Sequence, residues 1–113
     1  MDCIFCKILK GEIPNKKVYE DENVYAFYDI NPAASVHVIV IPKTHIESVN
    51  AINEANETIA SNIFNAIPKI ADILGIKEDG YRVITNIGEN GGQTVKHLHF
   101  HILGGEKLND KLV

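Results

Sequence analysis

Residues 97–103 read His-Leu-His-Phe-His-Ile-Leu, and this stretch decides the fold. Imidazole and apolar side chains alternate in it, which is the two-residue period of a β-strand with one buried face. We therefore expect a strand over residues 96–103. Its three histidines, His97, His99 and His101, should project from one face while the apolar residues face a core. Because three imidazoles on one face are costly to accommodate as packing alone, this face is our candidate for chemistry.

The rest of the chain supplies four more strands and two helices by the same reading of periodicity. Residues 36–41 are almost continuously apolar, which implies cover on both faces of that strand. The connections between the strands are short, which favours an antiparallel sheet and an α+β fold over a parallel α/β one. Strands are expected over residues 17–20, 24–30, 36–41 and 81–87, and helices over residues 3–9 and 53–74, giving a five-stranded antiparallel sheet with one long and one short helix.

Both expected helices carry start or stop signals. Asp2 is a candidate cap for the short helix, which Gly11 and Pro14 should end. Gly75 is the natural stop of the long helix, and Pro68 should either kink it or remove a hydrogen bond on its solvent side. One apolar stripe follows the helical period along the long helix, formed by Ile59, Ile63, Ile67, Ile70 and Leu74.

Length and composition restrict the class of protein. The chain has 113 residues, which is the size of one domain spanning residues 1–113, and is 45% hydrophobic. Fifteen acidic against eleven basic residues leave a net charge of −4, so we expect no binding to nucleic-acid polymers or to anionic membrane surfaces. No apolar run approaches the length of a membrane span, and the first residues lack a secretory layout, so a cytoplasmic location is expected. The segment 104–113 is polar and is expected to be mobile.

A glycine-rich loop, residues 88–96, precedes the histidine strand. Glycines allow successive backbone N–H groups to point into one concavity, which is an anion-binding nest. A Gly-Gly pair before a strand is more often merely a turn. Its position next to three imidazoles nevertheless favours the interpretation as a phosphate site, because phosphoryl transfer requires an anion-binding loop close to a nucleophile.

Residues 97–103, which follow the glycine-rich loop, resemble the signature of the histidine triad superfamily, His-φ-His-φ-His-φ-φ with φ apolar. The resemblance extends from about residue 3 to residue 105, through Phe-Tyr-Asp-Ile-Asn-Pro at 27–32, His-Val-Ile-Val-Ile-Pro-Lys-Thr-His at 37–45 and Tyr-Arg-Val-Ile-Thr-Asn at 81–86. It is strongest to the nucleotide-binding, phosphoramidase-like branch. The resemblance implies a hydrolase that acts on purine nucleotides without an organic cofactor, and a homodimer whose sheets pair.

The resemblance also implies roles for individual residues. His99 matches the nucleophile that attacks the α-phosphorus of a nucleoside 5′-phosphoramidate and forms a nucleotidyl-histidine. Asp29 matches the carboxylate that grips the ribose hydroxyls, and Thr94 stands where many members have Ser. Phosphate contacts and proton-relay groups match His101, His37, Asn86, Gly92, Gln93 and Thr94, and the apolar cleft around the base matches Ile4, Phe5, Ile8, Phe27 and Ile30. The segment 106–113 lacks the aromatic residue that some members carry in this tail.

Cys3 and Cys6 form a Cys-x-x-Cys pair one helical turn apart. No strand fits before Cys3, which disfavours a thioredoxin-like motif. Structural zinc requires four nitrogen or sulfur ligands, and with His99 and His101 used for chemistry, His45 and His97 remain as partners. The sequence therefore predicts structural zinc on Cys3, Cys6, His45 and His97, with unliganded reduced thiols and a redox pair as alternatives.

Two other functions and one assembly are compatible with the sequence. The triad could supply catalytic ligands of a metal-dependent hydrolase, or the protein could sense nucleotides or act as a scaffold with incidental activity. An open five-stranded sheet exposes two edges, and the long helix has apolar residues beyond its main stripe, at Ala60, Phe64 and Ala71. A two-fold contact is the commonest way to cover such surface, so we expect a homodimer.

Overall fold

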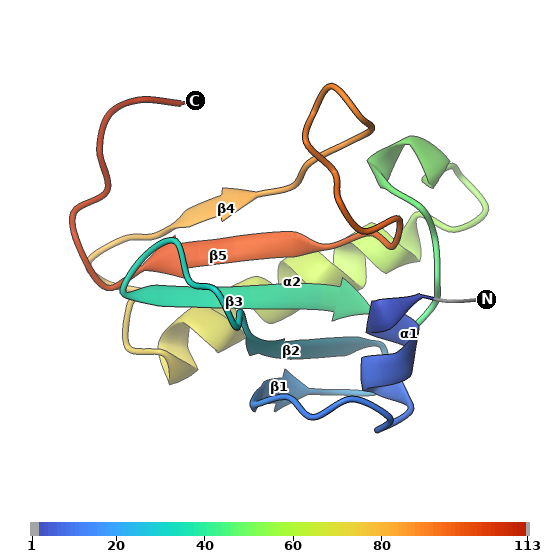
Figure 1. Cartoon of the computed structure of the whole chain (residues 1–113), viewed down its shortest axis with the longest axis horizontal. Helices are drawn as coiled ribbons and strands as arrows, with labels where there is room; N and C mark the ends of the chain where they lie inside the picture. Colours follow the sequence, from blue (N-terminus) through green and yellow to red (C-terminus); the bar gives the residue numbers. More distant parts are fainter. Residues whose placement is uncertain (1–2, 113) are drawn as a thin grey trace.

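A five-stranded antiparallel sheet forms the centre of the computed structural model, which describes residues 3–112 (Figure 1). The strand order is β1-β2-β3-β5-β4, which confirms the α+β class expected from the sequence. No helix among the described residues is long and apolar enough to cross a membrane. In chain order the elements are α1 (Ile4–Leu9), β1 (Lys17–Glu20), β2 (Val24–Tyr28), β3 (Val36–Pro42), the 3-10 helix η1 (Val49–Ala51), α2 (Thr58–Ile73), β4 (Arg82–Ile84) and β5 (Phe100–Gly104).

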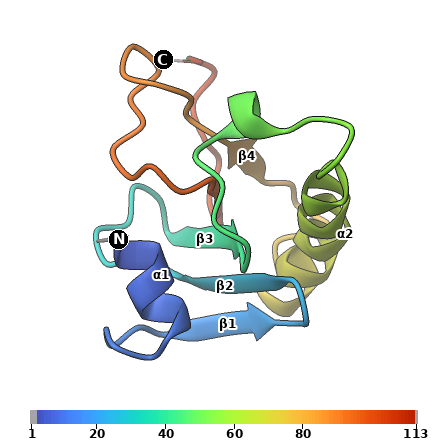
Figure 2. The same ribbon diagram turned by 90° about the vertical axis from the view of Figure 1, so that its right-hand side faces the viewer.

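The two helices cover opposite faces of the sheet (Figures 1 and 2). On β3, Val38 and Val40 belong to the core beneath α2, whereas Ile39 and Ile41 belong to a second cluster with residues of α1. All four side chains are buried, so the cover predicted for both faces of this strand is confirmed. The face with α1 is the one that receives the histidines.

Helix α2 follows the apolar stripe read from the sequence. Ile63, Ile67 and Ile70 are buried in the core. Pro68 lies on the exposed face, so the backbone hydrogen bond that it cannot donate is lost on the solvent side, as predicted. Gly75 ends the helix with φ of 72°, a left-handed conformation that favours glycine and completes the terminal hydrogen-bond pattern of the helix.

Several boundaries differ from the sequence prediction because side chains satisfy the backbone locally. Helix α2 begins at Thr58 rather than residue 53, since the side chains of Asn53 and Asn56 accept backbone N–H groups and form a turn instead. Strand β2 ends at Tyr28 rather than residue 30, because the Asp29 carboxylate accepts the N–H of Asn31. Strands β4 and β5 are also shorter than the expected 81–87 and 96–103.

Helix α1 begins at Ile4, and Cys3 is its N-cap, with the Cys3 thiol accepting the backbone N–H of Cys6 at 3.3 Å. Asp2, the cap expected from the sequence, lies outside the described residues. At the other end of the chain, the backbone N–H and the hydroxyl of Ser35 both donate to Glu106, and the Arg82 guanidinium donates to the carbonyl of Asn109. The polar segment after β5 is thus tied to β4 and to the residue before β3.

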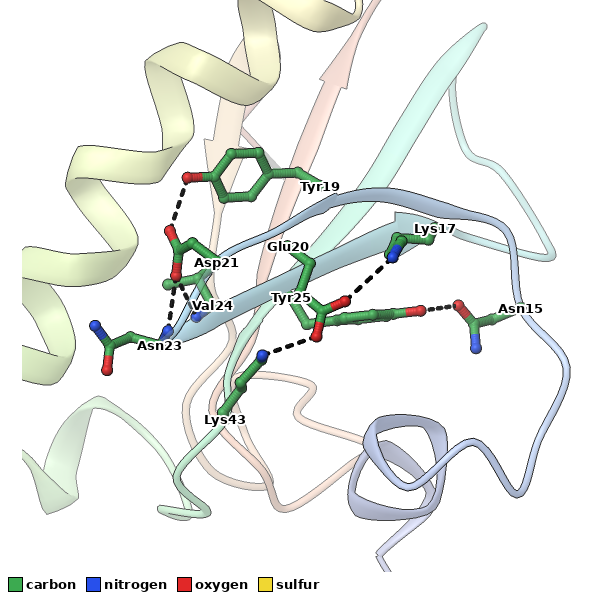
Figure 3. Close-up of polar contacts among 9 residues, drawn as sticks. All are labelled: Asn15, Lys17, Tyr19, Glu20, Asp21, Asn23, Val24, Tyr25 and Lys43. Carbon is green, nitrogen blue, oxygen red and sulfur yellow. Dashed lines mark hydrogen bonds and ion pairs between the residues drawn. The ribbon is translucent and has the colours of Figure 1, made fainter.

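Polar contacts fix the β1–β2 hairpin (Figure 3). The Asp21 carboxylate accepts the N–H groups of Asn23 and Val24 in the turn and the hydroxyl of Tyr19. Glu20 pairs with Lys17 and, at 2.8 Å, with Lys43. These contacts lie at one end of the sheet, and a further one, between Tyr25 and Asn15, lies beside the cleft described below.

Candidate active site and metal centre

The three alternating histidines lie at and just before the start of β5. His101 is within the strand, opposite Ile39 of β3, whereas His97 and His99 precede it. This part does not pair with a strand, because the backbone N–H of Leu98 donates to the carbonyl of Ile46 at 2.7 Å. The intervening apolar residues are buried in the core beneath α2, as the alternation predicted; they are Leu98, Phe100 and Ile102.

His99 is buried and has a defined tautomer. A peptide carbonyl only accepts hydrogen bonds, so the Nδ1 of His99, 2.8 Å from the His97 carbonyl oxygen, carries the proton and donates. The other ring nitrogen, Nε2, therefore has a free lone pair in the neutral ring. The ring packs edge-on against Phe5, with centroids 5.0 Å apart, and the Thr85 hydroxyl donates to the His99 carbonyl at 2.7 Å. These contacts hold His99 against Phe5 of α1.

Asp29, His37 and His101 form a second polar group beside His99. The backbone N–H of Ala33 donates to Nδ1 of His37 at 3.0 Å, so the neutral His37 ring carries its proton on Nε2. That N–H lies 2.9 Å from Nδ1 of His101 and 3.4 Å from a carboxylate oxygen of Asp29. His101 accepts on Nδ1 and therefore carries its own proton on Nε2.

The atoms of Asp29, His37 and His101 are close enough to hold a metal ion, but the tautomers favour a shared proton. A metal ion on Nε2 of His37 would have to displace the proton there. The Nδ1 lone pair of that ring is already used by Ala33, so the ring would have to become an imidazolate. The arrangement thus fits a hydrogen-bonded relay better than a set of metal ligands.

Burial keeps these imidazoles neutral near pH 7. It lowers the pKa of His37 and His99 below the ordinary histidine value, against the opposing charge of Asp29. Burial, together with the neighbouring His99 and His37 rings, lowers the pKa of His101 to about 4. A neutral ring is the form that can act as a nucleophile or as a neutral hydrogen-bond donor.

An apolar cleft of about 650 Å³ lies between α1 and the sheet. Phe5, Ile8 and Phe27 form its buried wall, and Ile30, with 90% of its surface exposed, stands at its mouth. Phe5 contacts both Phe27 and His99, so the candidate nucleophile, which is not itself a lining residue, packs against a wall residue of the cleft. The cleft is lined by the five residues that the resemblance assigned to the base, and also by Asp29, which it assigned to the ribose; the five are Ile4, Phe5, Ile8, Phe27 and Ile30.

The glycine-rich loop is held mainly by its own hydrogen bonds. The Gln93 amide accepts the N–H of Gly88 and donates to the carbonyls of Glu47 and Val95, while Asn86 donates to the carbonyl of Gly91. The N–H groups of Gly92 and Gln93 are bonded to carbonyls inside the loop. A nest built on these N–H groups is therefore not formed, and Asn86 and Gln93 shape the loop.

The backbone of this loop requires glycine at two positions. Gly92 has φ of 79°, and a Cβ on Gly91 would overlap the backbone of Ile87. Thr94 is exposed and lines a different hollow, of about 650 Å³, with His45 and Lys96. The structure thus separates Thr94 from the apolar cleft, although Ile4 borders both.

Four nitrogen and sulfur atoms converge between α1 and the segment before β5. The thiols of Cys3 and Cys6 and the Nδ1 atoms of His45 and His97 all lie within 4.8 Å of one another. Sulfur-to-nitrogen distances are 3.4 Å for Cys3–His97, 3.3 Å for Cys6–His45 and 3.6 Å for Cys6–His97. Ordinary zinc bond lengths give edges of about 3.5 Å in a tetrahedron of such ligands.

The chemistry of these donors also fits zinc. Nε2 of His97 donates to the Pro42 carbonyl at 3.1 Å, which leaves Nδ1 free to bind a metal, the carbonyl support usual for a histidine ligand. Burial raises the pKa of the Cys6 thiol, and the adjacent Cys3 adds to this effect. A bound cation would lower the pKa of both thiols and hold them as thiolates.

A sheet of this order, covered by a helix on each face and carrying alternating histidines at β5 with another on β3, defines a histidine triad protein. The chain belongs to the HIT family, whose HIT domain model matches residues 10–108. It is 43% identical over 111 residues to the purine nucleoside phosphoramidase of Escherichia coli K12, covering 98% of this chain and 93% of that protein. It is 51% identical over 105 residues to a HIT-like protein of Helicobacter pylori, covering 92% and 97%.

Solved structures give the same result for the fold. A HIT family hydrolase from Clostridium thermocellum has a TM-score of 0.96 at 54% identity, covering 99% of this chain and 97% of that one. A histidine triad protein from Clostridium difficile has a TM-score of 0.94 at 53% identity, covering 98% and 96%. The resemblance seen in the sequence is thus confirmed at the level of family and fold.

Sequence reasoning missed several residues around the site. Ile39 lines the cleft, and the alternation along β3 could have revealed it, because its neighbours Val38 and Val40 face α2. Thr85 was read only as part of a strand, and no periodicity marks its bond to His99. The cleft also includes loop residues without a sequence signal, namely Ile13, Pro14, Asn15 and Lys16, together with Tyr28 at the end of β2.

Proposed function

We propose that this protein is a nucleotide-binding hydrolase that cleaves the P–N bond of purine nucleoside 5′-phosphoramidates through a nucleotidyl-His99 intermediate. The observation that carries the proposal is the free Nε2 lone pair of His99, fixed by the His97 carbonyl, on a ring that packs against Phe5, a wall residue of the apolar cleft. The E. coli relative named a purine nucleoside phosphoramidase supports the substrate class.

In the first step the Nε2 lone pair of His99 forms a bond to the α-phosphorus, and the bond from phosphorus to the amine breaks. The departing amine takes the Nε2 proton of His101, whose ring centroid lies 5.1 Å from that of His99 and whose Nδ1 accepts from His37. In the second step water attacks the phosphorus, the bond to His99 breaks and the relay accepts the proton of the water. The products are a nucleoside monophosphate and the free amine.

The other roles are proposed from the family resemblance. The cleft takes the base, and Asp29, which lines it and contacts His37, takes the ribose hydroxyls. We assign Asn86, Gly92 and Gln93 of the glycine-rich loop to the phosphate, and the Thr94 hydroxyl, which lines the separate hollow, to the leaving group. With these assignments, the Asp29 carboxylate belongs both to the nucleoside site and to the relay.

We infer that Cys3, Cys6, His45 and His97 hold structural zinc, which would cross-link α1 to the segment carrying the triad. The same His97 gives its carbonyl to His99, so the metal centre and the nucleophile share one residue. Cys₂His₂ is a closed ligand set without the open position that catalytic zinc requires, which disfavours a metal-dependent hydrolase. A cytoplasmic location suits this centre, because reducing conditions keep the thiols available.

We also infer a single domain that forms a homodimer across the open edge at β4. Val83 of β4 and Phe64 of α2 are large apolar residues with 37% and 55% of their surface exposed. A two-fold contact that extends the sheet would cover them. Light scattering at micromolar concentration should give twice the monomer mass, and a monomer would refute this assembly.

His99→Ala and His99→Asn test the catalytic proposal. Both should abolish turnover of a nucleoside 5′-phosphoramidate and the adduct on the peptide containing His99, with a loss of several orders of magnitude, while nucleotide binding persists. Quenched-flow mass spectrometry with an acid-free work-up detects the adduct on the wild type. Full turnover with no histidine adduct at any time would refute covalent catalysis, and activity that tracks metal content would favour the metal-dependent alternative.

A further inference from the structure

Asn15 is a polar side chain at the mouth of the apolar cleft that the proposed mechanism does not use. It lies on the loop between α1 and β1 and lines the cleft with Ile13 and Lys16. The buried wall of this cleft is made of aromatic and aliphatic groups, which hold a planar base without distinguishing its edges. A fixed amide at the mouth is therefore placed where a base edge would emerge.

Two hydrogen bonds fix the Asn15 amide. The Tyr25 hydroxyl donates to its Oδ1 at 2.6 Å, and its Nδ2 donates to the Ile13 carbonyl at 3.1 Å (Figure 3 shows the first). A flipped amide would set Oδ1 against the Ile13 carbonyl, so two acceptors would face each other. Tyr25 is itself held by packing against Phe27, with ring centroids 6.0 Å apart. The Nδ2 donor and the Oδ1 acceptor of Asn15 therefore stay in these positions.

The fixed amide has one N–H and one oxygen lone pair left over. A 6-aminopurine offers the complementary pair, the N6 donor beside the N7 acceptor, which is the pairing that an asparagine amide makes with adenine. A 6-oxopurine offers two acceptors at that edge, and its O6 would face Oδ1 of Asn15. Lys16, a cation on the same rim, would favour the 6-oxopurine if it were the residue that reads the base.

We propose that Asn15, positioned by Tyr25 and Ile13, is a specificity-determining residue that favours adenine over 6-oxopurines in the cleft. This inference rests on the proposed function, since it assumes that the cleft takes the base of the nucleotide. It assigns a base preference to one side chain outside the triad, the relay and the metal centre.

The test compares adenosine and inosine 5′-phosphoramidates, whose bases have an amino or an oxo group at the 6-position and differ otherwise only in the proton on N1. The wild type should favour adenosine in kcat/KM by about tenfold, at the lower end of the range for such a pair because Asn15 is exposed. Asn15→Ala should bring the ratio close to one by losing adenosine turnover. Tyr25→Phe should lower the ratio partly, because it frees one end of the amide, and Lys16→Met, the matched change on the rim, should leave the ratio unchanged.

Affinities for AMP and IMP, measured by calorimetry on the same proteins, separate the two proposals. Equal kcat/KM and equal affinity for both bases in the wild type would overturn the role of Asn15 and leave the hydrolase intact. An unchanged ratio in Asn15→Ala, or a ratio removed by Lys16→Met instead, would also overturn it. Absence of turnover with a preserved AMP preference would refute the hydrolase alone, and absence of binding to either nucleotide would overturn both.

Discussion

Thr85→Val removes the hydroxyl that holds the backbone of the proposed nucleophile while keeping the shape of the side chain. The hydroxyl donates to the His99 carbonyl at 2.7 Å from the first residue after β4. The ladder between β4 and β5 ends at the pair Ile84–His101, so Thr85 continues the connection where strand pairing stops. We therefore treat Thr85 as a positioning residue for His99.

The expected size of the effect follows from one half-buried hydrogen bond. Such a bond contributes about 1 kcal/mol to the free energy of unfolding, which for a domain of this size corresponds to about 3–6 °C in Tm. If the same energy is lost in the transition state, because the His99 ring moves relative to the phosphorus, kcat falls about fivefold. KM should change little, because Thr85 does not line the cleft.

Stopped-flow or steady-state kinetics on a nucleoside phosphoramidate, together with thermal melts, measure both quantities. Thr85→Ser keeps the hydroxyl and should restore kcat, and also most of the lost Tm. A drop in Tm with unchanged kcat would show that Thr85 supports the sheet only. Equal values of both quantities in Thr85→Val and the wild type would refute the reasoning altogether.

Two further predictions concern the metal centre and the titration of the relay. Cys6→Ser should release zinc, as measured by elemental analysis of protein purified without chelator. It should also lower Tm more than it lowers the kcat of the remaining folded protein, because the energy of metal binding is also folding energy. Wild-type protein that contains no zinc when purified under reducing conditions would contradict the centre. The His101 ring should titrate at about pH 4 by NMR, because burial disfavours its charged form. The unfolded chain protonates this ring near pH 6.5, so its contribution to stability is complete above that pH and is lost as pH falls toward 4; a midpoint near 6.5 in the folded protein would contradict this.

The sequence predicted the architecture well because its strongest signals have one structural solution each. The stripe from Ile59 to Leu74 can bury only as a helix, and the alternation from His97 can place Leu98 and Phe100 in a core only with an extended backbone. The boundaries were less predictable. Asn53 and Asn56 lie within the helical pattern, but their side chains compete for backbone N–H groups and form a turn.

The candidate site divides in the same way. Spacing identified the Cys3–Cys6 pair and the histidines, and the fold brings Cys3, Cys6, His45 and His97 into one group, from which the His97 carbonyl bonds to His99. What spacing could not supply is the direction of each hydrogen bond. The contact from Ala33 to His37 depends on the loop between β2 and β3, and it sets the tautomer of the whole relay. Likewise, the glycine-rich loop satisfies its own N–H groups, which composition alone does not reveal.

Backbone groups set the tautomers of His37, His97 and His99, and His37 in turn sets that of His101. Carbonyls of Pro42 and His97 accept from His97 and His99, which leaves one free nitrogen for a metal and one for a phosphorus. A backbone N–H donates to Nδ1 of His37, so this ring carries its proton on Nε2 and donates it to His101. His101 in turn carries its own proton on Nε2 and can donate it. Imidazoles that would be equivalent in water thus differ in which nitrogen is free, which suits them to the proposed roles of ligand, nucleophile and acid, because a buried neutral ring must match the polarity of the peptide group that it meets.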